Sequence, residues 1–436
     1  MGHLTTFSRE HRALLMRLGA GPVALPEPKD ERARAGWQEI LEILFTREDA
    51  ALAARLPITP ASLEAIAWRV QRSPQELKPQ LDRMADKGIV TDLVDPATGK
   101  TTYQLSPPIV GFFEFSMMRA SDMIPKRRMA EALDAYEHGD DTFAREAFDA
   151  DTVVGRALVH ETALPQDALP DVLDWERATA LIEEARSLSV QRCYCRQKAE
   201  YLGRPCDVPI ERCLALNYGA DFLVRHGFAR RIDRSEAKEI LAASRQDNLV
   251  QIADNVRDTP TFICNCCPCH CGLIGGLTEF DLPAVNPSAF QAASNLDLCK
   301  GCSRCSRACP VGAITMAPLR LYGQRKNKLM PVIDTDRCIG CGVCADQCRQ
   351  HAMHMERRPA RPHVPVNSVE RIVRMSLERG RLPHLLFDAG KNRSSRFFNS
   401  VLRALCALPP VEKALASNQV RSRFVDYALK NIKAPA

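Results

Sequence analysis

Two stretches of the sequence carry cysteines at matching intervals. DLCKGCSRCSRACPVGAI begins at Asp297, and DRCIGCGVCADQCRQHAM begins 39 residues later at Asp336. In each stretch, three cysteines at steps of three can meet three irons of one cubane, while the fourth cysteine reaches across to the other cluster. We therefore expect two 4Fe-4S clusters with crossed ligands. The first set is Cys299, Cys302, Cys305 and Cys348, and the second is Cys338, Cys341, Cys344 and Cys309.

The glycines of this repeat and one substitution in it bear on the same chemistry. Gly301, Gly340 and Gly342 are expected to let each loop turn tightly and bring backbone amides toward the sulfides. Arg349 stands where the first half has proline, and a guanidinium pointing inward there would raise the potential of the adjacent cluster. Zinc is the alternative metal, but a tetrahedral zinc site does not require the same run of four cysteines to occur twice. Residues 297–353 resemble the two-cluster bacterial ferredoxins, which implies two pseudo-symmetric βαβ-type halves.

A second group of nine cysteines lies upstream of the repeat. It comprises Cys193, Cys195, Cys206 and Cys213, followed by Cys264, Cys266, Cys267, Cys269 and Cys271 of the run CNCCPCHC. Nine sulfurs exceed the need of one tetrahedral zinc or one cubane, so we expect two sites or one site of unusual nuclearity. Adjacent Cys266 and Cys267 cannot both face one simple cubane without strain, so one of them is expected to serve a different metal, to bridge, or to stay free. His270 offers either a nitrogen ligand or a hydrogen bond.

Three hypotheses for these nine cysteines stay open. The first, which we favour, is one or more additional iron-sulfur clusters that exchange electrons with the repeat. The second is a structural zinc site, and the third is a thiol–disulfide exchange centre, which the lack of a simple CxxC in CNCCPCHC disfavours. Nearby cations are expected to offset thiolate charge, which would lower the pKa of Cys193 and Cys195. These cations are Arg192, Arg196 and Lys198.

Composition limits what the rest of the chain can be. At 436 residues it is long enough for several domains with their own cores, so its 18 cysteines are not needed as disulfide staples. We expect a cytoplasmic protein, because the start lacks the apolar core of a secretory signal and no window approaches the length of a membrane span. The net charge of +6 conceals a basic tail, since residues 350–436 carry 16 Lys and Arg against 6 Asp and Glu.

Residues 38–108 have the order of a winged-helix module, with helical patterns followed by a hairpin. Ser73 and Glu76 form the pattern of a capping box, and the strand patterns IVTDLV and TTYQL flank a DPATGK turn. Residues 30–105 carry 10 Lys and Arg against 12 Asp and Glu, whereas a phosphate-binding face shows a basic excess. We therefore expect this module to dock a protein partner and not to bind nucleic acid.

The fold class that these patterns predict is α+β. The expected units are an N-terminal segment at 1–37, a winged-helix-like module at 38–108, a mostly helical cysteine-rich domain at 109–290, a dicluster ferredoxin domain at 291–355 and a basic helical tail at 356–436. The run GFFEFSMMR at 111–119 is expected to pack in a core and not to line a cofactor pocket. The tail is a candidate docking surface for a partner.

Nearly the whole sequence is similar to a family of uncharacterised multi-cysteine 4Fe-4S proteins, found mainly in anaerobic and sulfur-metabolising bacteria. The resemblance is carried by GFFEFSMMR, RCYCRQKAEYLGRPCDVPIERC, NLVQIADNVRDTPTFICNCCPCHC, the cysteine repeat and ASNQVRSR. Members usually have cysteine at the position of His270 and glycine at that of Pro268, so this chain lacks one sulfur of the family's run. The resemblance implies a redox function and names no substrate.

Together these features predict an iron-sulfur electron-transfer protein with two 4Fe-4S clusters and a further metal or cluster site, acting as a subunit or partner of a cytosolic redox system. Two alternatives stay open. One is a redox-sensing regulator that binds DNA through the N-terminal module. The other is a reductase with its active site at residues 264–271, for which no catalytic residue is assigned.

Overall fold

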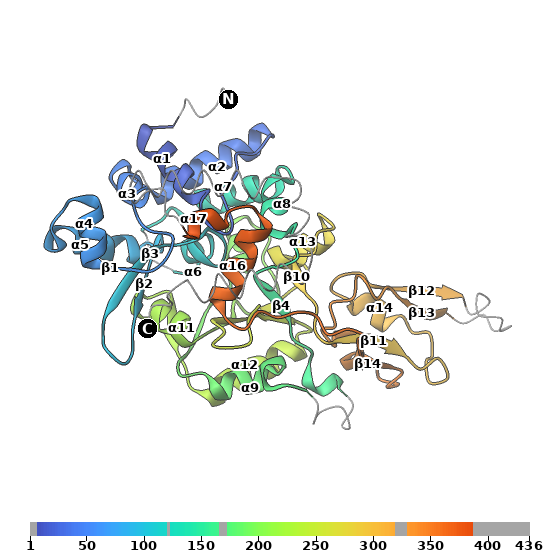
Figure 1. The fold of residues 1–436 in the computed structure, drawn as a ribbon. Coiled ribbons are helices and arrows are strands. Elements are labelled where there is room, and N and C mark those ends of the chain that lie inside the picture. The colour runs from blue at the N-terminus through green and yellow to red at the C-terminus, as the bar shows by residue number, and fades with distance from the viewer. Residues whose placement is uncertain (1–6, 120–122, 165–171, 319–328, 387–436) are drawn as a thin grey trace, which may run out of the picture.

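The computed structural model describes residues 7–119, 123–164, 172–318 and 329–386. Figure 1 shows three regions: a helical N-terminal region in blue, a sheet with its helices in green and yellow, and the cysteine repeat in orange, which projects from the sheet on the right. The chain crosses back over the body after the repeat, where α16 lies in the middle of the view. Mixed helix and strand content is in agreement with the α+β prediction.

The N-terminal region combines helices with a small three-stranded sheet. Its elements are α1 (Arg9–Leu18), α2 (Glu31–Leu44), α3 (Arg47–Ala53), β1 (Ala61–Ser62), α4 (Leu63–Val70), α5 (Pro74–Asp86), β2 (Val90–Val94) and β3 (Thr101–Leu105). The strands are arranged in the order β1-β3-β2, with all pairs antiparallel. Ser73 caps α5, and Ser73 and Glu76 form the reciprocal hydrogen bonds of the predicted capping box, both at 3.3 Å.

Short helices join this region to the central sheet. They are the irregular turn η1 (Pro108–Phe112), α6 (Phe113–Met118), α7 (Lys126–His138) and α8 (Thr142–Phe148). Trp37 of α2, Phe112 and Tyr136 of α7 are buried in one hydrophobic core that extends through the whole N-terminal region. Phe113 and Met117 of the GFFEFSMMR run are buried in that core, as the sequence predicts.

A seven-stranded sheet forms the centre of the molecule. Its strands are β4 (Gly155–Ala157), β5 (Leu188–Arg192), β6 (Glu211–Leu216), β7 (Ala229–Arg231), β8 (Val250–Asp254), β9 (Phe262–Cys266) and β10 (Val285–Asn286), in the order β10-β4-β8-β9-β6-β5-β7. All neighbours are antiparallel except β10 and β4. The accompanying helices and turns are η2 (Glu161–Ala163), η4 (Asp174–Glu176), α9 (Ala178–Glu184), α10 (Tyr194–Tyr201), α11 (Asn217–Arg225), α12 (Arg234–Gln246) and α13 (Gly272–Thr278).

This sheet corrects the expectation of a mostly helical domain at 109–290. The strands are three to six residues long apart from the two-residue β10, and β8 is buried along its whole length. A short run buried on both faces shows no alternation of polar and apolar residues, so its pattern cannot be separated from that of a buried helix turn. The prediction failed because these strands depend on long-range pairing that local periodicity does not reveal.

The cysteine repeat folds into two halves, each with one short helix and strands at its ends. Strand β11 (Phe290–Ser294) pairs antiparallel with β14 (Met353–Arg357), and β12 (Ile314–Pro318) pairs antiparallel with β13 (Leu329–Ile333). The helices are α14 (Arg304–Ala308) and α15 (Val343–Asp346). The first and last strands of the repeat therefore lie side by side, and so do its two middle strands.

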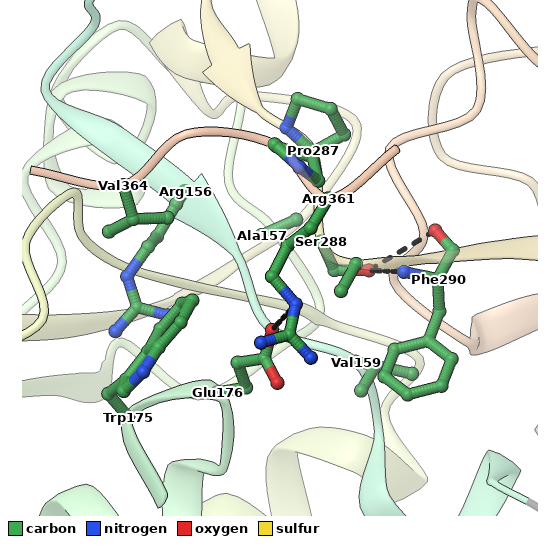
Figure 2. A pocket seen from close by; sticks show the side chains of 12 residues that line it. Arg156, Ala157, Val159, Trp175, Glu176, Pro287, Ser288, Phe290, Arg361 and Val364 are labelled. Atoms are coloured by element: carbon green, nitrogen blue, oxygen red, sulfur yellow. Dashed lines mark hydrogen bonds and ion pairs between the residues drawn. The ribbon is translucent and has the colours of Figure 1, made fainter. Parts of the chain in front are cut away.

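A polar junction fixes the chain after β14 to the central sheet. Figure 2 shows Arg156 of β4 over Trp175, with the guanidinium carbon 5.4 Å from the ring centroid, and Arg361 beside Glu176. The Arg361 Nε lies 3.5 Å from Glu176 Oε1. The void between these side chains has a volume of about 10 Å³, which is room for about one water molecule. This junction is therefore packed and polar, and it offers no binding pocket.

The last described helices, α16 (Ser368–Glu378) and α17 (Leu382–Leu386), pack on the body. Arg371 pairs with Asp254 of β8, and the carboxylate of Glu378 accepts hydrogen bonds from the backbone and side chain of Thr152. Arg381 pairs with Glu146. The basic residues at this end of the described chain are thus engaged within the molecule, while the predicted tail beyond residue 386 lies outside the described residues. Among the described helices, none has both the length and the apolar character of a bilayer span.

Candidate metal centres

The eight cysteines of the repeat gather around the two loops that precede α14 and α15. Five of them are buried, Cys302 is exposed, and Cys309 and Cys348 are half-buried. Burial raises the pKa of Cys305, and thiolate charge on Cys299 and Cys348 acts in the same direction. Burial raises the pKa of Cys341 to about 12, with Cys309 and Cys338 as its charged neighbours. The charged neighbours named here for Cys305 and for Cys341 are members of the crossed set expected for each.

Left-handed backbone conformations form the two loops. Gly301 and Gly340 have φ values of 70° and 71°, and the next-but-one residues, Ser303 and Gly342, have φ values of 61° and 86°. A Cβ atom on Gly340 would lie 2.1 Å from the Phe290 carbonyl oxygen, so no side chain fits there. The two halves of the repeat thus share the same left-handed backbone conformation at corresponding positions.

Backbone amides are directed at three cysteine sulfurs, and one of these amides belongs to a glycine of the predicted loops, Gly301. The amides of Gly301, Ala313 and Met353 donate to the Sγ atoms of Cys299, Cys309 and Cys348, at 3.4, 3.2 and 3.4 Å. Donors of this kind stabilise thiolate ligands and raise the potential of a cluster. Arg349 is exposed, so its charge is screened by solvent and does not act as an inward-pointing cation.

Six of the nine upstream cysteines form a closed ring of thiols, which we call the six-thiol ring. Its members, in order of hydrogen-bonded contact, are Cys193, Cys195, Cys271, Cys266, Cys264 and Cys213, which closes on Cys193. Three come from the β5–α10–β6 segment and three from the β9–α13 segment. The pairing of β6 with β9 in the sheet is what brings the two segments together.

The thiols of this ring alternate between acceptors and donors. Hydrogen bonds from Cys213 and Cys266 lower the pKa of Cys264 to about 6, and hydrogen bonds from ring neighbours also hold the pKa of Cys193 and Cys271 well below the usual value. The three thiols between them have raised pKa values, because they donate to these acceptors. Six neighbouring sulfurs, four on buried and two on half-buried cysteines, are a donor set for soft metals.

Arg196 of α10 places a buried positive charge beside the six-thiol ring. Its side chain is 2% exposed, and its Nε and Nη2 atoms have no hydrogen-bond partner among the described residues. Burial opposes the charge, yet the neighbouring sulfurs of Cys193 and Cys213 raise the pKa of this guanidinium. A buried guanidinium with unused donors requires an anionic partner. A metal-sulfur group held by these thiols would supply that negative charge, so the residues present fit such a group.

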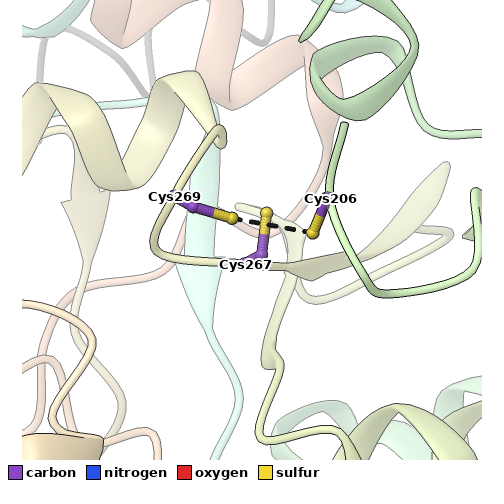
Figure 3. Close-up of side chains that lie close together, drawn as sticks. All are labelled: Cys206, Cys267 and Cys269. Atoms are coloured by element: carbon purple, nitrogen blue, oxygen red, sulfur yellow. Dashed lines mark hydrogen bonds between the residues drawn. The ribbon is translucent and has the colours of Figure 1, made fainter. Parts of the chain in front are cut away.

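The other three upstream cysteines form a separate cluster on the outer side, which we call the outer thiol cluster. Figure 3 shows Cys206, Cys267 and Cys269 converging on one point, with Sγ of Cys206 and Sγ of Cys269 3.6 Å apart. The three Sγ atoms all lie within 4.8 Å of one another, and no other group of His, Cys, Asp or Glu ligand atoms in the described part of the chain is that compact. His270 therefore does not join these three thiols as a ligand.

Comparison with known proteins identifies the repeat. A model of the 4Fe-4S dicluster domain matches residues 298–352. The pyruvate synthase subunit PorD of Methanothermobacter marburgensis is 34% identical over 68 residues, which cover 68% of that protein and 16% of this chain. The chain belongs to the ferredoxin-type iron-sulfur proteins. The dicluster match supports iron-sulfur clusters as its cofactors.

Other ferredoxin-type proteins are also similar to part of the chain. The methylamine utilization ferredoxin-type protein MauM of Methylorubrum extorquens is 33% identical over 101 residues, or 21% of this chain and 45% of that protein. MauM of Paracoccus denitrificans is 32% identical over 101 residues, or 21% of this chain and 44% of that protein. The chain thus spans less than half the length of these two relatives. No solved structure matches the chain.

In this ferredoxin-type protein the six-thiol ring borders a cavity of about 330 Å³. Side chains of Phe113, Phe115 and Phe222 line it together with all six ring cysteines. Glu114 also faces the cavity, and its Oε2 accepts a hydrogen bond from the Gly111 amide at 3.0 Å. Burial raises the pKa of Glu114 to about 7. The cavity therefore combines sulfur ligands, apolar walls and a carboxyl group able to give or take a proton near neutral pH.

A short path of hydrogen bonds joins the ferredoxin segment to the six-thiol ring. The backbone amide of His160 donates to the Cys341 carbonyl at 2.9 Å, and its ring Nε2 bonds the Leu249 carbonyl at 3.0 Å. The next residue after Leu249, Val250 of β8, pairs with Cys266 of β9. One continuous hydrophobic cluster includes cysteines from both sites. The half of the repeat that carries Cys341 is therefore the half packed on the sheet.

Several site residues behave differently from what the sequence suggests. The pKa of Cys193 is lowered as expected, but that of Cys195 is raised, because its thiol donates to Cys193 and Cys271. Lys198 does not serve the thiols directly, since its ammonium group pairs with the Glu137 carboxylate. Glu114 and Glu137 lie outside every cysteine motif. Only the GFFEFSMMR run, which contains Glu114, gives a signal in the sequence. Its predicted place in a core holds for Phe113 and Met117, but the prediction that the run lines no pocket is wrong, because it also supplies part of the wall of this cavity.

Proposed function

We propose that this ferredoxin-type protein carries single electrons between a redox partner protein and a further metal centre at the six-thiol ring. In this proposal each crossed cysteine set of residues 299–348 holds one 4Fe-4S cluster, and such clusters, when bound, accept and release one electron at a time. The observation that carries the proposal is the closed ring of six thiols, four of them buried and two half-buried, beside the buried guanidinium of Arg196, whose Nε and Nη2 have no hydrogen-bond partner among the described residues. Thiolate sulfurs are the ligands that soft metals and iron-sulfur clusters prefer, so this ring supports a metal centre.

The protein residues have separate tasks in this scheme. The amides that donate to Cys299, Cys309 and Cys348 stabilise the added negative charge of a reduced centre. Arg196 does the same for the ring from within the protein, where its charge is not screened by water. The contact of His160 with Cys341 and Leu249 keeps the two sites at a fixed separation.

The N-terminal region is proposed to be a winged-helix-like module that docks the partner. Its helix–helix–hairpin order and the strand order β1-β3-β2 support that interpretation. Trp68 on α4 is 74% exposed, and large exposed aromatic side chains are typical of protein interfaces. The alternative of a redox-sensing DNA-binding regulator is weakened by the acidic balance of this region. Salt-dependent binding of the purified protein to duplex DNA would restore it.

A second candidate function is a reductase with its active site at the ring, and the cavity of about 330 Å³ favours it. An apolar disulfide or related sulfur compound would be cleaved at its S–S bond with two electrons and two protons, which gives two thiols. The electrons would come through the ferredoxin segment, and Glu114 is placed to give one proton and to recover it from solvent. Turnover of such a disulfide by the reduced protein alone separates this function from simple electron transfer.

Iron and sulfide content after anaerobic purification, with electron paramagnetic resonance of the reduced state, tests the main proposal. Two cubanes give about eight irons per chain, and an iron-sulfur centre at the ring raises the total to about twelve or more. A protein with about eight irons and an iron-free ring would confine electron transfer to residues 297–353. A colourless protein without iron would overturn the proposal as a whole.

A further inference from the structure

The outer thiol cluster joins the same two chain segments that build the six-thiol ring. Cys206 lies in the loop between α10 and β6, and Cys267 and Cys269 lie in the turn between β9 and α13. Cys267 is buried at 4% exposure, while Cys269 is exposed. The outer thiol cluster therefore lies near the surface, where the α10–β6 loop meets the β9–α13 turn. The Cys267 thiol faces inward, and the Cys269 thiol faces solvent.

The spacing of the sulfurs indicates how many metal ions the outer thiol cluster can hold. In a tetrahedral zinc site with Zn–S distances of about 2.3 Å, neighbouring sulfurs are about 3.8 Å apart. The three Sγ atoms of the outer thiol cluster lie within 4.8 Å of one another, and the Cys206–Cys269 separation is 3.6 Å. One ion at the centre of these three atoms would meet all of them with little movement.

The other cysteines of this chain serve as an internal comparison. The eight ferredoxin cysteines, whose spacing suits cubanes, contain no group of three sulfurs within 4.8 Å, and the six-thiol ring contains none either, in the part of the chain that the structure describes. A cubane presents each thiolate to a different iron and so holds its sulfurs further apart than a single ion does. The outer thiol cluster alone has the compact geometry of a mononuclear site.

We propose that Cys206, Cys267 and Cys269 bind a single zinc ion, which ties the α10–β6 loop to the β9–α13 turn and so holds the two segments of the six-thiol ring together. Three thiolates are soft ligands that suit zinc, and a solvent molecule on the exposed side completes the tetrahedron. The proposal does not depend on what the six-thiol ring holds.

A disulfide is the competing explanation for close cysteines. The 3.6 Å separation of the Cys206 and Cys269 sulfurs is well beyond the S–S bond length of about 2.05 Å. Pairing these two would also leave the buried Cys267 thiol beside them without a role. A metal ion would be bound by all three sulfurs.

Metal analysis of the full-length protein, purified anaerobically in a zinc-containing medium, tests the site. We expect about one zinc per chain in the wild type, and a loss of at least about tenfold in Cys206→Ser and in Cys269→Ser. Iron content and the spectra of the ferredoxin segment should be unchanged in both variants. The matched control is Cys302→Ser, which removes an exposed cysteine of the repeat and should keep its zinc.

Replacement of the metal by cobalt gives a second readout that does not depend on activity. Co²⁺ bound by three thiolates shows strong sulfur-to-metal charge-transfer absorption, which should be absent from Cys269→Ser. Removal of zinc by a chelator should speed backbone hydrogen exchange at residues 203–209 and 267–271 and leave residues 297–314 unchanged, because only the former segments lose a tie.

Four results would overturn the proposal. They are a wild-type protein without zinc, zinc retained in both serine variants, zinc lost equally from Cys302→Ser, and loss of iron instead of zinc from Cys269→Ser. The last result would assign the three thiols to an iron-sulfur cluster. Unchanged hydrogen exchange after zinc removal would contradict the tying role.

Discussion

Cys266 and Cys267 are adjacent in the chain, yet their thiols belong to different clusters. Cys266, at the end of β9, contacts Cys264 and Cys271 in the six-thiol ring, whereas Cys267 lies within 4.8 Å of Cys206 and Cys269. Alternate side chains of a strand share a face, so Cys264 and Cys266 of β9 both face the ring. The strand ends at Cys266, and the turn that follows carries Cys267 and Cys269 to Cys206 before the chain returns to the ring at Cys271. The tight run CNCCPCHC thus serves two sites at once.

Replacing Arg196 with glutamine should lower the midpoint potential of a centre held by the six-thiol ring. The guanidinium is buried beside Cys193 and Cys213, so its loss removes a positive charge that stabilises the reduced state. We expect a shift on the order of 50–100 mV toward negative values, measured by redox titration followed by electron paramagnetic resonance. The matched control is Arg349→Gln, an exposed residue whose replacement should leave all potentials within about 20 mV. Equal shifts in both variants would contradict the special role of Arg196.

The sequence predicts the ferredoxin segment, and the dicluster match at residues 298–352 confirms it, because the cysteine spacing of such a segment is local. Gly340 and Gly342 are followed within a few residues by the cysteines that they position, so the loop can be inferred from one short run. The division of the upstream cysteines into six and three could not be inferred in this way. It depends on the pairing of β6 with β9, which brings Cys213 next to Cys264 across 51 positions of sequence.

Glu114 shows a second limit of the sequence. It lies in a segment with a helical pattern, and it belongs to no metal-binding motif. Its importance comes from its place beside the cavity and the thiols, which depends on how the N-terminal helices pack against the sheet. Arg196 differs, because it stands next to Cys195 in the sequence and is predicted there to offset thiolate charge.

Glu114→Gln should change the pH dependence of stability. Burial raises the Glu114 pKa from 4.5 to about 7, so the folded protein keeps its proton longer than the unfolded chain does. The wild type therefore loses stability relative to the variant as pH rises through this window, by about 2 to 3 kcal/mol between pH 5 and pH 8 at most. Melting temperatures of both proteins at the two pH values measure the difference, with Glu10→Gln as the control. A difference that does not vary with pH would show that Glu114 is ionised in the folded state.

Cys302→Ser should remove one cluster signal and leave the N-terminal region folded. Cys302 is exposed, so its replacement removes a ligand of the proposed first set without opening a cavity. The core that includes Trp37, Phe112 and Tyr136 contains no residue of the repeat. Electron paramagnetic resonance should show the loss of about one of the two ferredoxin signals. Limited proteolysis should still yield an intact N-terminal fragment, and simultaneous unfolding of that region would contradict the independence of the two cores.

His160→Ala should loosen the ferredoxin segment from the sheet while keeping both of its clusters. The imidazole bonds Asp346 Oδ2 of α15 at 2.8 Å and the Leu249 carbonyl at 3.0 Å, and its removal leaves the buried carbonyl without this partner. We expect a loss of about 2 to 4 kcal/mol in the free energy that holds the segments together. Faster hydrogen exchange at residues 341–348 and 249–252 would report it. Thr162→Val removes a more exposed bond to the same carboxylate and should cost less than about 1 kcal/mol. If both variants exchange alike, the contact of His160 is not what fixes the ferredoxin segment beside the six-thiol ring.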